Sequence, residues 1–298
     1  MPKIIFSLFE NEHLSERICK GINAENGSYI NRQFPDKETY IRILSVVEKK
    51  DVILICSLDK PDNKFLPLLY FCKLLKDLHA KSICLVSPYL SYMRQDKQFK
   101  NGEAITSKYF ATIISSLVDK LITIDPHLHR IKSLNEIYNI PCITLDASKL
   151  ISKWIKNNIA NPLLIGPDSE SEQWVSKIAK GASAPFIILN KIRLNDNLVE
   201  IVVPKINKYK NYTPVLVDDI ISTGHTMLET IMHLKMASMP PPICIAVHAV
   251  FAKNSYRKLK KTQINTIITT NTINHKSNQI DISEMIIREL LIKSGSDK

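Results

Sequence analysis

Short apolar runs alternate with amphipathic stretches along nearly the whole chain. This alternation is typical of strands and helices arranged around a mostly parallel sheet. In the first half we expect helices over 13–20, 65–78 and 105–117, and strands over 4–6, 51–57, 82–87, 120–124 and 142–145. The pattern therefore predicts an α/β fold in which helices flank a central sheet.

The series of elements restarts after Asp146. Helices are expected over 149–157, 171–180, 226–237 and 285–292, and strands over 163–165, 186–189, 198–203, 214–217 and 243–250. The 298 residues also exceed one average domain of roughly 150 residues. We therefore predict two domains, residues 1–146 and 147–298, each with a mostly parallel central sheet.

The composition is that of a folded protein, with 45% hydrophobic and 23% charged residues. No apolar stretch is long enough to span a bilayer, and the first apolar run is too short for a secretory signal. The six cysteines lie apart, and none forms a Cys-x-x-Cys pair. We therefore expect a cytoplasmic protein with no membrane partner, whose cysteines are reduced core residues.

The formal net charge of +11 favours anionic partners. Nucleic acid, an anionic membrane surface and phosphorylated metabolites all satisfy that condition. The Lys-rich stretches at 205–210 and 257–261 match no nucleic-acid-binding signature. Charge alone does not choose among the partners, but the sequence does not favour nucleic acid.

The most informative segment is VLVDDIISTGHTM at 215–227. An apolar strand carries Asp218 and Asp219 to its carboxyl end, and a helix follows after a short loop. Loop amides and a helix N-terminus together bind phosphate. Further hydroxyl donors are Ser222, Thr223 and Thr226. Because the two carboxylates would repel a phosphate, we expect them to face sugar hydroxyls or a metal.

This segment resembles the phosphoribosyl pyrophosphate motif of type I phosphoribosyltransferases and of ribose-phosphate pyrophosphokinases. Four further segments resemble the pyrophosphokinases: FPDKE at 34–38, PYLSYMRQD at 88–96, IDPH at 124–127 and NKIR at 190–193. In that family the first lies on a hairpin that reaches a neighbouring subunit's ATP site, and the second is a nucleotide loop. Plain phosphoribosyltransferases lack both of these elements.

The resemblance implies two phosphoribosyltransferase-like domains and a ribose-phosphate diphosphokinase that uses ATP, ribose 5-phosphate and Mg²⁺. Lys191 and Arg193 would be the catalytic cations of a flexible loop. ATP would be bound by Phe34, Asp36, Glu38, Arg94, Gln95, Asp96 and His127. Ribose phosphate would be bound by Asp168, Asp218, Asp219, Ser222, Thr223, Gly224, His225 and Thr226. His127 and Asp168 would also hold metal, and the protein would be a homo-oligomer, either a dimer or a hexamer.

Three positions depart from the family pattern. Lys37 replaces a glycine, His225 replaces a small residue, and the segment after Asp168 reads SESE where the family continues with glycine. The helical spacing that follows favours the SESE segment as the first turn of a helix, with its acids directed to solvent. Because the segment after Asp168 departs from the family pattern, a non-catalytic regulatory paralogue remains an alternative. So does a phosphoribosyltransferase, although the loop that contains Arg94 opposes it.

Overall fold

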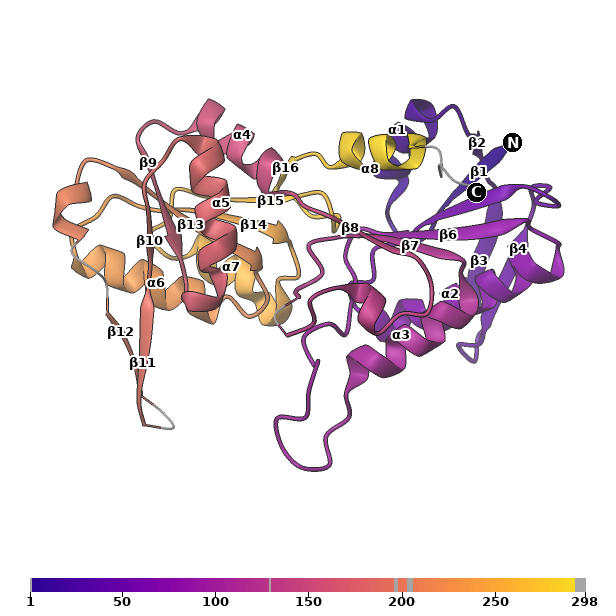
Figure 1. Ribbon diagram of the computed structural model, residues 1–298, viewed down its shortest axis with the longest axis horizontal. Coiled ribbons are helices and arrows are strands. Elements are labelled where there is room, and N and C mark those ends of the chain that lie inside the picture. The colour runs from indigo at the N-terminus through magenta and orange to yellow at the C-terminus, as the bar shows by residue number, and fades with distance from the viewer. Residues whose placement is uncertain (1, 129, 196–197, 203–205, 293–298) are drawn as a thin grey trace. The chain divides into compact units, whose positions relative to one another are not determined.

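The computed structural model describes residues 2–128, 130–195, 198–202 and 206–292 (Figure 1). The chain forms two compact units. The first contains the residues up to Leu145 together with the C-terminal helix α8 (Ser283–Leu291), and the second spans Asp146–Ile282. Each unit is built on its own sheet, as the restart of the sequence pattern predicted.

Helix α8 belongs to the first unit because of its contacts there. It packs against α1 (Glu12–Gly21), and Lys3 Nζ donates a hydrogen bond to the Leu290 carbonyl at 3.1 Å. The division expected at residues 146 and 147 assigns α8 to the second domain instead. Sequence separation hides this contact, because α8 returns to the first sheet from the far end of the chain.

The first unit is built on a six-stranded sheet in which every neighbouring pair is parallel, in the order β2-β1-β5-β6-β7-β8. Its strands are β1 (Lys3–Ser7), β2 (Glu25–Asn26), β5 (Asp51–Ile55), β6 (Ser82–Ser87), β7 (Lys120–Ile124) and β8 (Cys142–Leu145). The further helices are α2 (Pro61–Asp77), α3 (Thr106–Leu117) and the 3₁₀ turn η1 (Leu134–Glu136). Two strands stand apart as an antiparallel hairpin, β3 (Tyr29–Gln33) and β4 (Thr39–Ile43).

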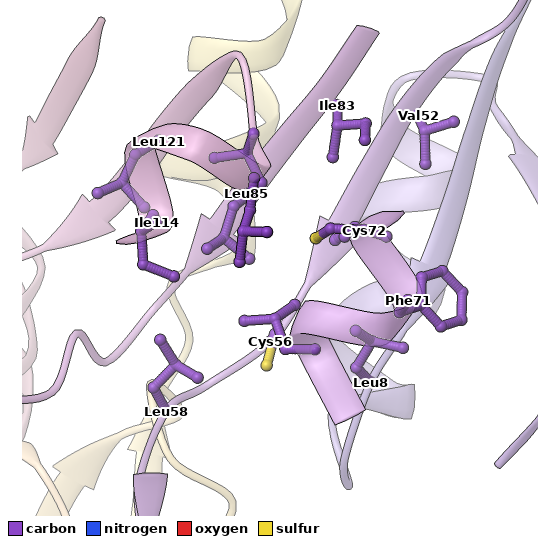
Figure 2. Packing of buried hydrophobic residues seen from close by; sticks show 14 of the residues in the cluster. Leu8, Val52, Cys56, Leu58, Phe71, Cys72, Ile83, Leu85, Ile114 and Leu121 are labelled. Carbon is purple, nitrogen blue, oxygen red and sulfur yellow. The ribbon is translucent and has the colours of Figure 1, made fainter. Parts of the chain in front are cut away.

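Helices α2 and α3 cover one face of this sheet. Figure 2 shows Leu85 and Leu121 from the strands beside Ile114 of α3, in the same buried cluster as Phe71 of α2. Alternate strand residues point to this face, so leucines of successive strands meet the same helices. Fully burying each such side chain contributes about 1.5–3 kcal/mol.

The six cysteines are free thiols. Four of them are buried, as expected of core residues, and Cys84 and Cys142 are partly buried. Burial raises the pKa of Cys244 to about 12, so this thiol stays protonated at neutral pH. Within the described residues, no helix combines the length and the apolar character that a membrane span needs.

The second unit repeats the architecture with a six-stranded parallel sheet in the order β10-β9-β13-β14-β15-β16. Its strands are β9 (Pro162–Gly166), β10 (Phe186–Ile188), β13 (Thr213–Ile220), β14 (Ile243–His248), β15 (Thr266–Thr270) and β16 (Asn278–Ile280). Its helices are α4 (Ser148–Asn158), α5 (Glu172–Ala182), α6 (His225–Met236) and α7 (Ser255–Lys260). Shorter 3₁₀ turns are η2 (Ser169–Ser171), η3 (Ile206–Tyr209) and η4 (Ala252–Asn254).

One pair of strands differs from the sequence expectation. Strand β11 (Asn190–Asn195) pairs antiparallel with β12 (Leu198–Val202), and the two form a separate two-stranded sheet. Residues 190–193, expected in a flexible loop, therefore lie in a strand. A strand over 198–203 was expected in the series around the central sheet; of these residues, Leu198–Val202 form the partner strand of this hairpin, and residue 203 lies outside the described residues.

Candidate active site

Strand β13 brings two acids to the carboxyl edge of the second sheet. Residues 214–217 are buried, and Asp218 and Asp219 follow near the end of the strand. A loop over 221–224 then leads into α6, whose N-cap is Gly224. The predicted strand, acid pair, loop and helix are present in that order.

Asp168 lies just beyond the end of β9, the strand that pairs with β13. The sheet has β10 on one side of β9 and β13 on the other, so the strand order reverses direction at this point. Open α/β sheets bind ligands outside the carboxyl ends of their strands at such a reversal. Asp168, the acid pair and the loop thus gather where this architecture binds ligands.

Two neighbouring acids affect the ionisation of Asp218. Burial raises the pKa of the Asp218 carboxyl well above its usual range, and the charges of Asp219 and Asp168 raise it further. The Asp219 amide donates to Asp218 Oδ1 at 3.0 Å, which opposes the rise without cancelling it. A cation or a set of hydroxyl donors would relieve this repulsion. The edge therefore suits sugar hydroxyls or a divalent cation.

A complete cage of protein ligands for a metal is not found in the described part of the chain. No group of three or more His, Cys, Asp or Glu side chains there could hold a metal ion. Mg²⁺, however, keeps several waters and is usually bound through one or two carboxylates together with substrate phosphates. The crowded carboxylates of Asp168 and Asp218 fit a magnesium ion bound in that way.

The loop over 221–224 turns tightly against α7. Gly224 has φ of 72°, a left-handed conformation that glycine adopts without strain. A Cβ added there would lie 3.3 Å from both Ser255 Cβ and Leu259 Cδ1. No side chain caps α6, so its N-terminus keeps the preference of helix starts for an anion.

His225 is the first residue of α6, and its side chain is 77% exposed. Its Nε2 lies 2.9 Å from Glu229 Oε1, one helical turn further along. The imidazole of His225 therefore interacts with a carboxylate of its own helix, α6. Among the other expected phosphate ligands, Ser222 and Thr226 are partly buried and Thr223 is exposed.

The segment after Asp168 forms the first turn of a helix. Asp168 Oδ1 accepts a hydrogen bond from the Ser171 amide at 3.1 Å, and Ser171 Oγ donates to the Asp168 carbonyl at 2.6 Å. The turn η2 passes directly into α5, whose first residue is the exposed Glu172. This confirms the helical interpretation of the SESE segment.

The sequence resemblance implies ribose 5-phosphate as a substrate, and we expect the Glu172→Gln variant to use it as the unchanged protein does. The Glu172 carboxylate is exposed at a helix N-terminus, where an acid is favoured, so its removal relieves no repulsion on a bound phosphate. The measurement is the half-saturating concentration of ribose 5-phosphate, with Asp168→Asn as the variant that should raise it. A lower value for Glu172→Gln would show that this acid does face the phosphate.

In the first unit, the expected nucleotide loop follows β6. Arg94 is exposed, Gln95 Oε1 accepts from Thr106 Oγ1 at 3.1 Å, and Asp96 Oδ1 accepts from Arg130 Nη1 at 3.1 Å. The ion pair between Asp96 and Arg130 holds one end of this loop in place. Sequence reasoning missed Arg130, because its partner is 34 residues away.

His127 lies beyond the carboxyl end of β7, the neighbour of β6 in the sheet. Asp125 and His127 have φ of 38° and 51°, values that residues other than glycine rarely adopt. Such strain concentrates at functional sites. The sheet thus places the expected triphosphate ligand and the expected nucleotide loop after adjacent strands.

The tip of the β3–β4 hairpin carries Phe34, Asp36 and Glu38. The Phe34 amide donates to the Glu38 carbonyl at 2.8 Å, and the Glu38 amide donates to Asp36 Oδ1 at 3.2 Å. Lys37 has φ of 76°, the left-handed conformation that suits the glycine of the family element. The turn is therefore kept without the glycine, and it exposes Phe34 at its tip.

Lys191 and Arg193 occupy alternate positions of β11. They stand opposite Ile201 and Val199 of β12 in the antiparallel register.

Comparison with known proteins covers both units. Residues 3–117 match the model of the N-terminal domain of ribose phosphate pyrophosphokinase, and residues 133–284 match the phosphoribosyl transferase domain. The ribose-phosphate pyrophosphokinase of Saccharolobus solfataricus is 31% identical over 285 residues, covering 93% of this chain and 96% of that protein. The chain belongs to the ribose-phosphate pyrophosphokinase family. The resemblance drawn from the sequence motifs is thereby confirmed.

Two further comparisons agree with this family. The ribose-phosphate pyrophosphokinase of Sulfolobus acidocaldarius is 30% identical over 283 residues, again covering 93% of this chain and 96% of that protein. The crystal structure of phosphoribosylpyrophosphate synthetase from Mycobacterium smegmatis matches with a TM-score of 0.85 at 21% identity, covering 97% of this chain and 98% of that one. The structural match confirms the predicted fold class of two phosphoribosyltransferase-like domains.

Proposed function

We propose that this family member transfers the pyrophosphoryl group of ATP to the 1-hydroxyl of ribose 5-phosphate, giving phosphoribosyl pyrophosphate and AMP. The observation that carries the proposal is the meeting of Asp168, Asp218, Asp219 and the 221–224 loop at one edge of the second sheet. Ribose 5-phosphate carries hydroxyl donors, which match the acids, and a phosphate, which matches loop amides at a helix N-terminus.

On the sugar side, Asp218 and Asp219 accept hydrogen bonds from the ribose hydroxyls. Those hydroxyls supply donors that offset the repulsion of the Asp218 carboxylate by Asp219 and Asp168. The 5-phosphate is bound by the segment from Ser222 through Thr223, Gly224 and His225 to Thr226. Serine and threonine hydroxyls supplement the backbone amides there.

On the nucleotide side, the Arg94 guanidinium and the Gln95 amide hold the adenine nucleotide, and Asp96 fixes the loop through Arg130. The hairpin tip with Phe34, Asp36 and Glu38 completes the ATP site of a neighbouring subunit. His127 binds the triphosphate.

Magnesium would be held by His127 and by Asp168, in each case together with substrate phosphate oxygens. When bound, it offsets the negative charge that gathers on those oxygens during transfer. The oxygen of the ribose 1-hydroxyl forms a bond to the β-phosphorus and releases its proton to solvent, while the bond from that phosphorus to the oxygen of the α-phosphate breaks and AMP departs. Lys191 and Arg193 stabilise the charge that develops on the transferred group. The reduced cysteines suit a protein that works in the cytoplasm.

The direct test is an assay with purified protein, ATP, ribose 5-phosphate and a divalent cation, monitored for AMP. We expect AMP only when all three are present. Omitting ribose 5-phosphate controls for simple hydrolysis of ATP, and chelation of the cation should stop the reaction. A protein that binds ATP but forms no AMP would instead be the regulatory paralogue.

The assembly can be tested through the hairpin tip. We expect Phe34→Ala to raise the half-saturating ATP concentration and to leave ribose 5-phosphate dependence unchanged, because Phe34 is 40% exposed and lies at the tip of the hairpin. Leu44→Ala is a matched control, since it also removes an exposed apolar side chain and lies beyond the other end of β4.

The same proposal requires a homo-oligomer, a dimer or a hexamer. Light scattering on the active protein should give a mass of at least two chains. A fully active monomer would contradict the shared ATP site, and so would an equal effect of Phe34→Ala and Leu44→Ala on ATP use.

A further inference from the structure

Two successive peptide carbonyls of the 221–224 loop are held by the segment that leads into α7. The Phe251 amide donates to the Ile221 carbonyl at 2.8 Å, and Ser255 Oγ donates to the Ser222 carbonyl at 2.6 Å. Both donors come from the connection that follows β14, the strand beside β13. The segment that follows β14 therefore holds one side of the loop through these two hydrogen bonds.

These hydrogen bonds fix where the loop amides point. The described residues contain no cis peptide bond. In a planar trans peptide the carbonyl and the following N–H point in opposite directions. With the carbonyls of Ile221 and Ser222 turned toward the Phe251–Ser255 segment, the amides of Ser222 and Thr223 face away from it. Adjacent amides oriented together form an anion-binding concavity.

The Ser255 hydroxyl is well placed to enforce this orientation. Ser255 is 0% exposed, and the loop packs directly on it, since a Cβ at Gly224 would lie 3.3 Å from Ser255 Cβ. Because Ser255 is fully buried, water has little room to take the place of the lost hydroxyl, and a partly buried carbonyl that loses its donor is unfavourable. Without Ser255 Oγ, the peptide between Ser222 and Thr223 is therefore free to rotate, and its amide can turn away from the anion.

We infer that Ser255 is a positioning residue that orients the Thr223 amide toward the 5-phosphate of bound ribose 5-phosphate. The inference rests on the proposed function, and it assigns a role to a residue outside the phosphate motif. Ser255 itself does not touch the substrate. It acts through the Ser222 peptide, and its loss should affect sugar-phosphate binding and leave nucleotide binding unaffected.

The experiment compares the full-length protein with Ser255→Ala and with a control, Ser152→Ala. Ser152 is also buried, and its Oγ lies within hydrogen-bond distance of the carbonyls of Ser148, at 2.7 Å, and Ile178, at 3.0 Å, both outside the loop. Binding of ribose 5-phosphate is measured by calorimetry without ATP, and AMP formation is measured separately. Amide resonances report whether the Thr223 N–H shifts when ribose 5-phosphate is added.

We expect Ser255→Ala to weaken ribose 5-phosphate binding by about tenfold, as loss of one hydrogen bond to a charged group predicts. The Thr223 amide shift should be lost, ATP half-saturation should not change, and Ser152→Ala should bind ribose 5-phosphate normally. Unchanged binding by Ser255→Ala would overturn the inference. Equal weakening in both serine variants, or of ATP and ribose 5-phosphate alike, would overturn it too. If ribose 5-phosphate binding depends on Ser255 yet the unchanged protein forms no AMP, the proposed function fails while this inference stands.

Discussion

Replacing Lys191 or Arg193 by Ala is expected to lower turnover by about 100- to 1,000-fold, as loss of a transition-state contact does. Binding of ATP should change little. Transfer of a pyrophosphoryl group concentrates negative charge on the phosphate oxygens as the bond to the α-phosphate breaks. A cation that meets this charge only in the transition state contributes to the rate and little to ground-state binding.

The design needs a control for charge, because each variant also removes one positive charge from a chain of formal net charge +11. Lys208→Ala removes the same charge nearby in sequence, from an ammonium that lies 4.8 Å from the Tyr209 ring. Steady-state turnover and direct ATP binding are measured for all three variants. Equal losses of turnover and ATP binding would contradict a transition-state role, and so would a matching loss in Lys208→Ala.

The sequence predicted most strands of the two central sheets because they are covered on both faces, but β2, β15 and β16 were not predicted. Strands covered on both faces read as continuous apolar runs, as in residues 52–55, and need no alternating pattern. Strand β3 was not predicted because four of its five residues are exposed. Three of these four are polar, so the segment shows no run of apolar residues. Strand β16 has only three residues, of which one is buried, so its signal was too short to detect.

The candidate site was predictable where its parts are contiguous in sequence. The acid pair, the loop and the start of α6 all lie within 215–227, and local chemistry sufficed to suggest sugar and phosphate binding. The supporting contacts come from distant residues. Arg130 reaches Asp96 across 34 positions, and Ser255 reaches Ser222 across 33. No spacing rule brings such residues together, because the order of strands in the sheet determines which loops meet.

Asp218→Asn is expected to raise thermal stability and to lower activity. Burial and the charges of Asp219 and Asp168 make the ionised Asp218 carboxylate unfavourable in the folded protein, and a neutral amide removes that repulsion. The same substitution removes a charged acceptor for the ribose hydroxyls. We expect kcat/KM for ribose 5-phosphate to fall roughly 10- to 100-fold. Opposite changes in stability and activity are typical of residues that are strained for function.

The stability gain should depend on pH in a defined direction. The folded-state pKa of Asp218 is raised, so the acid favours folding when it is protonated and opposes folding as the pH rises through that pKa. The penalty vanishes below the unfolded-state pKa, near 3.9 for an ordinary Asp. Melting temperatures of the variant and the unchanged protein should therefore differ most at neutral pH and converge toward about pH 4.

Asp146→Asn provides a matched control, because its expected effect on the melting temperature has the opposite sign. Burial acts to raise the pKa of Asp146, but hydrogen bonds from Lys177 and Ser148 outweigh it and lower the pKa. A group with a lowered folded-state pKa stabilises the fold above its unfolded-state pKa, and that contribution is lost as the pH falls. Asp146→Asn should therefore lower the melting temperature at neutral pH and leave ribose 5-phosphate use unchanged. If Asp218→Asn instead lowers the melting temperature as Asp146→Asn does, the carboxylate of Asp218 is stabilised in the folded protein, and the repulsion inferred at this edge of the sheet is absent.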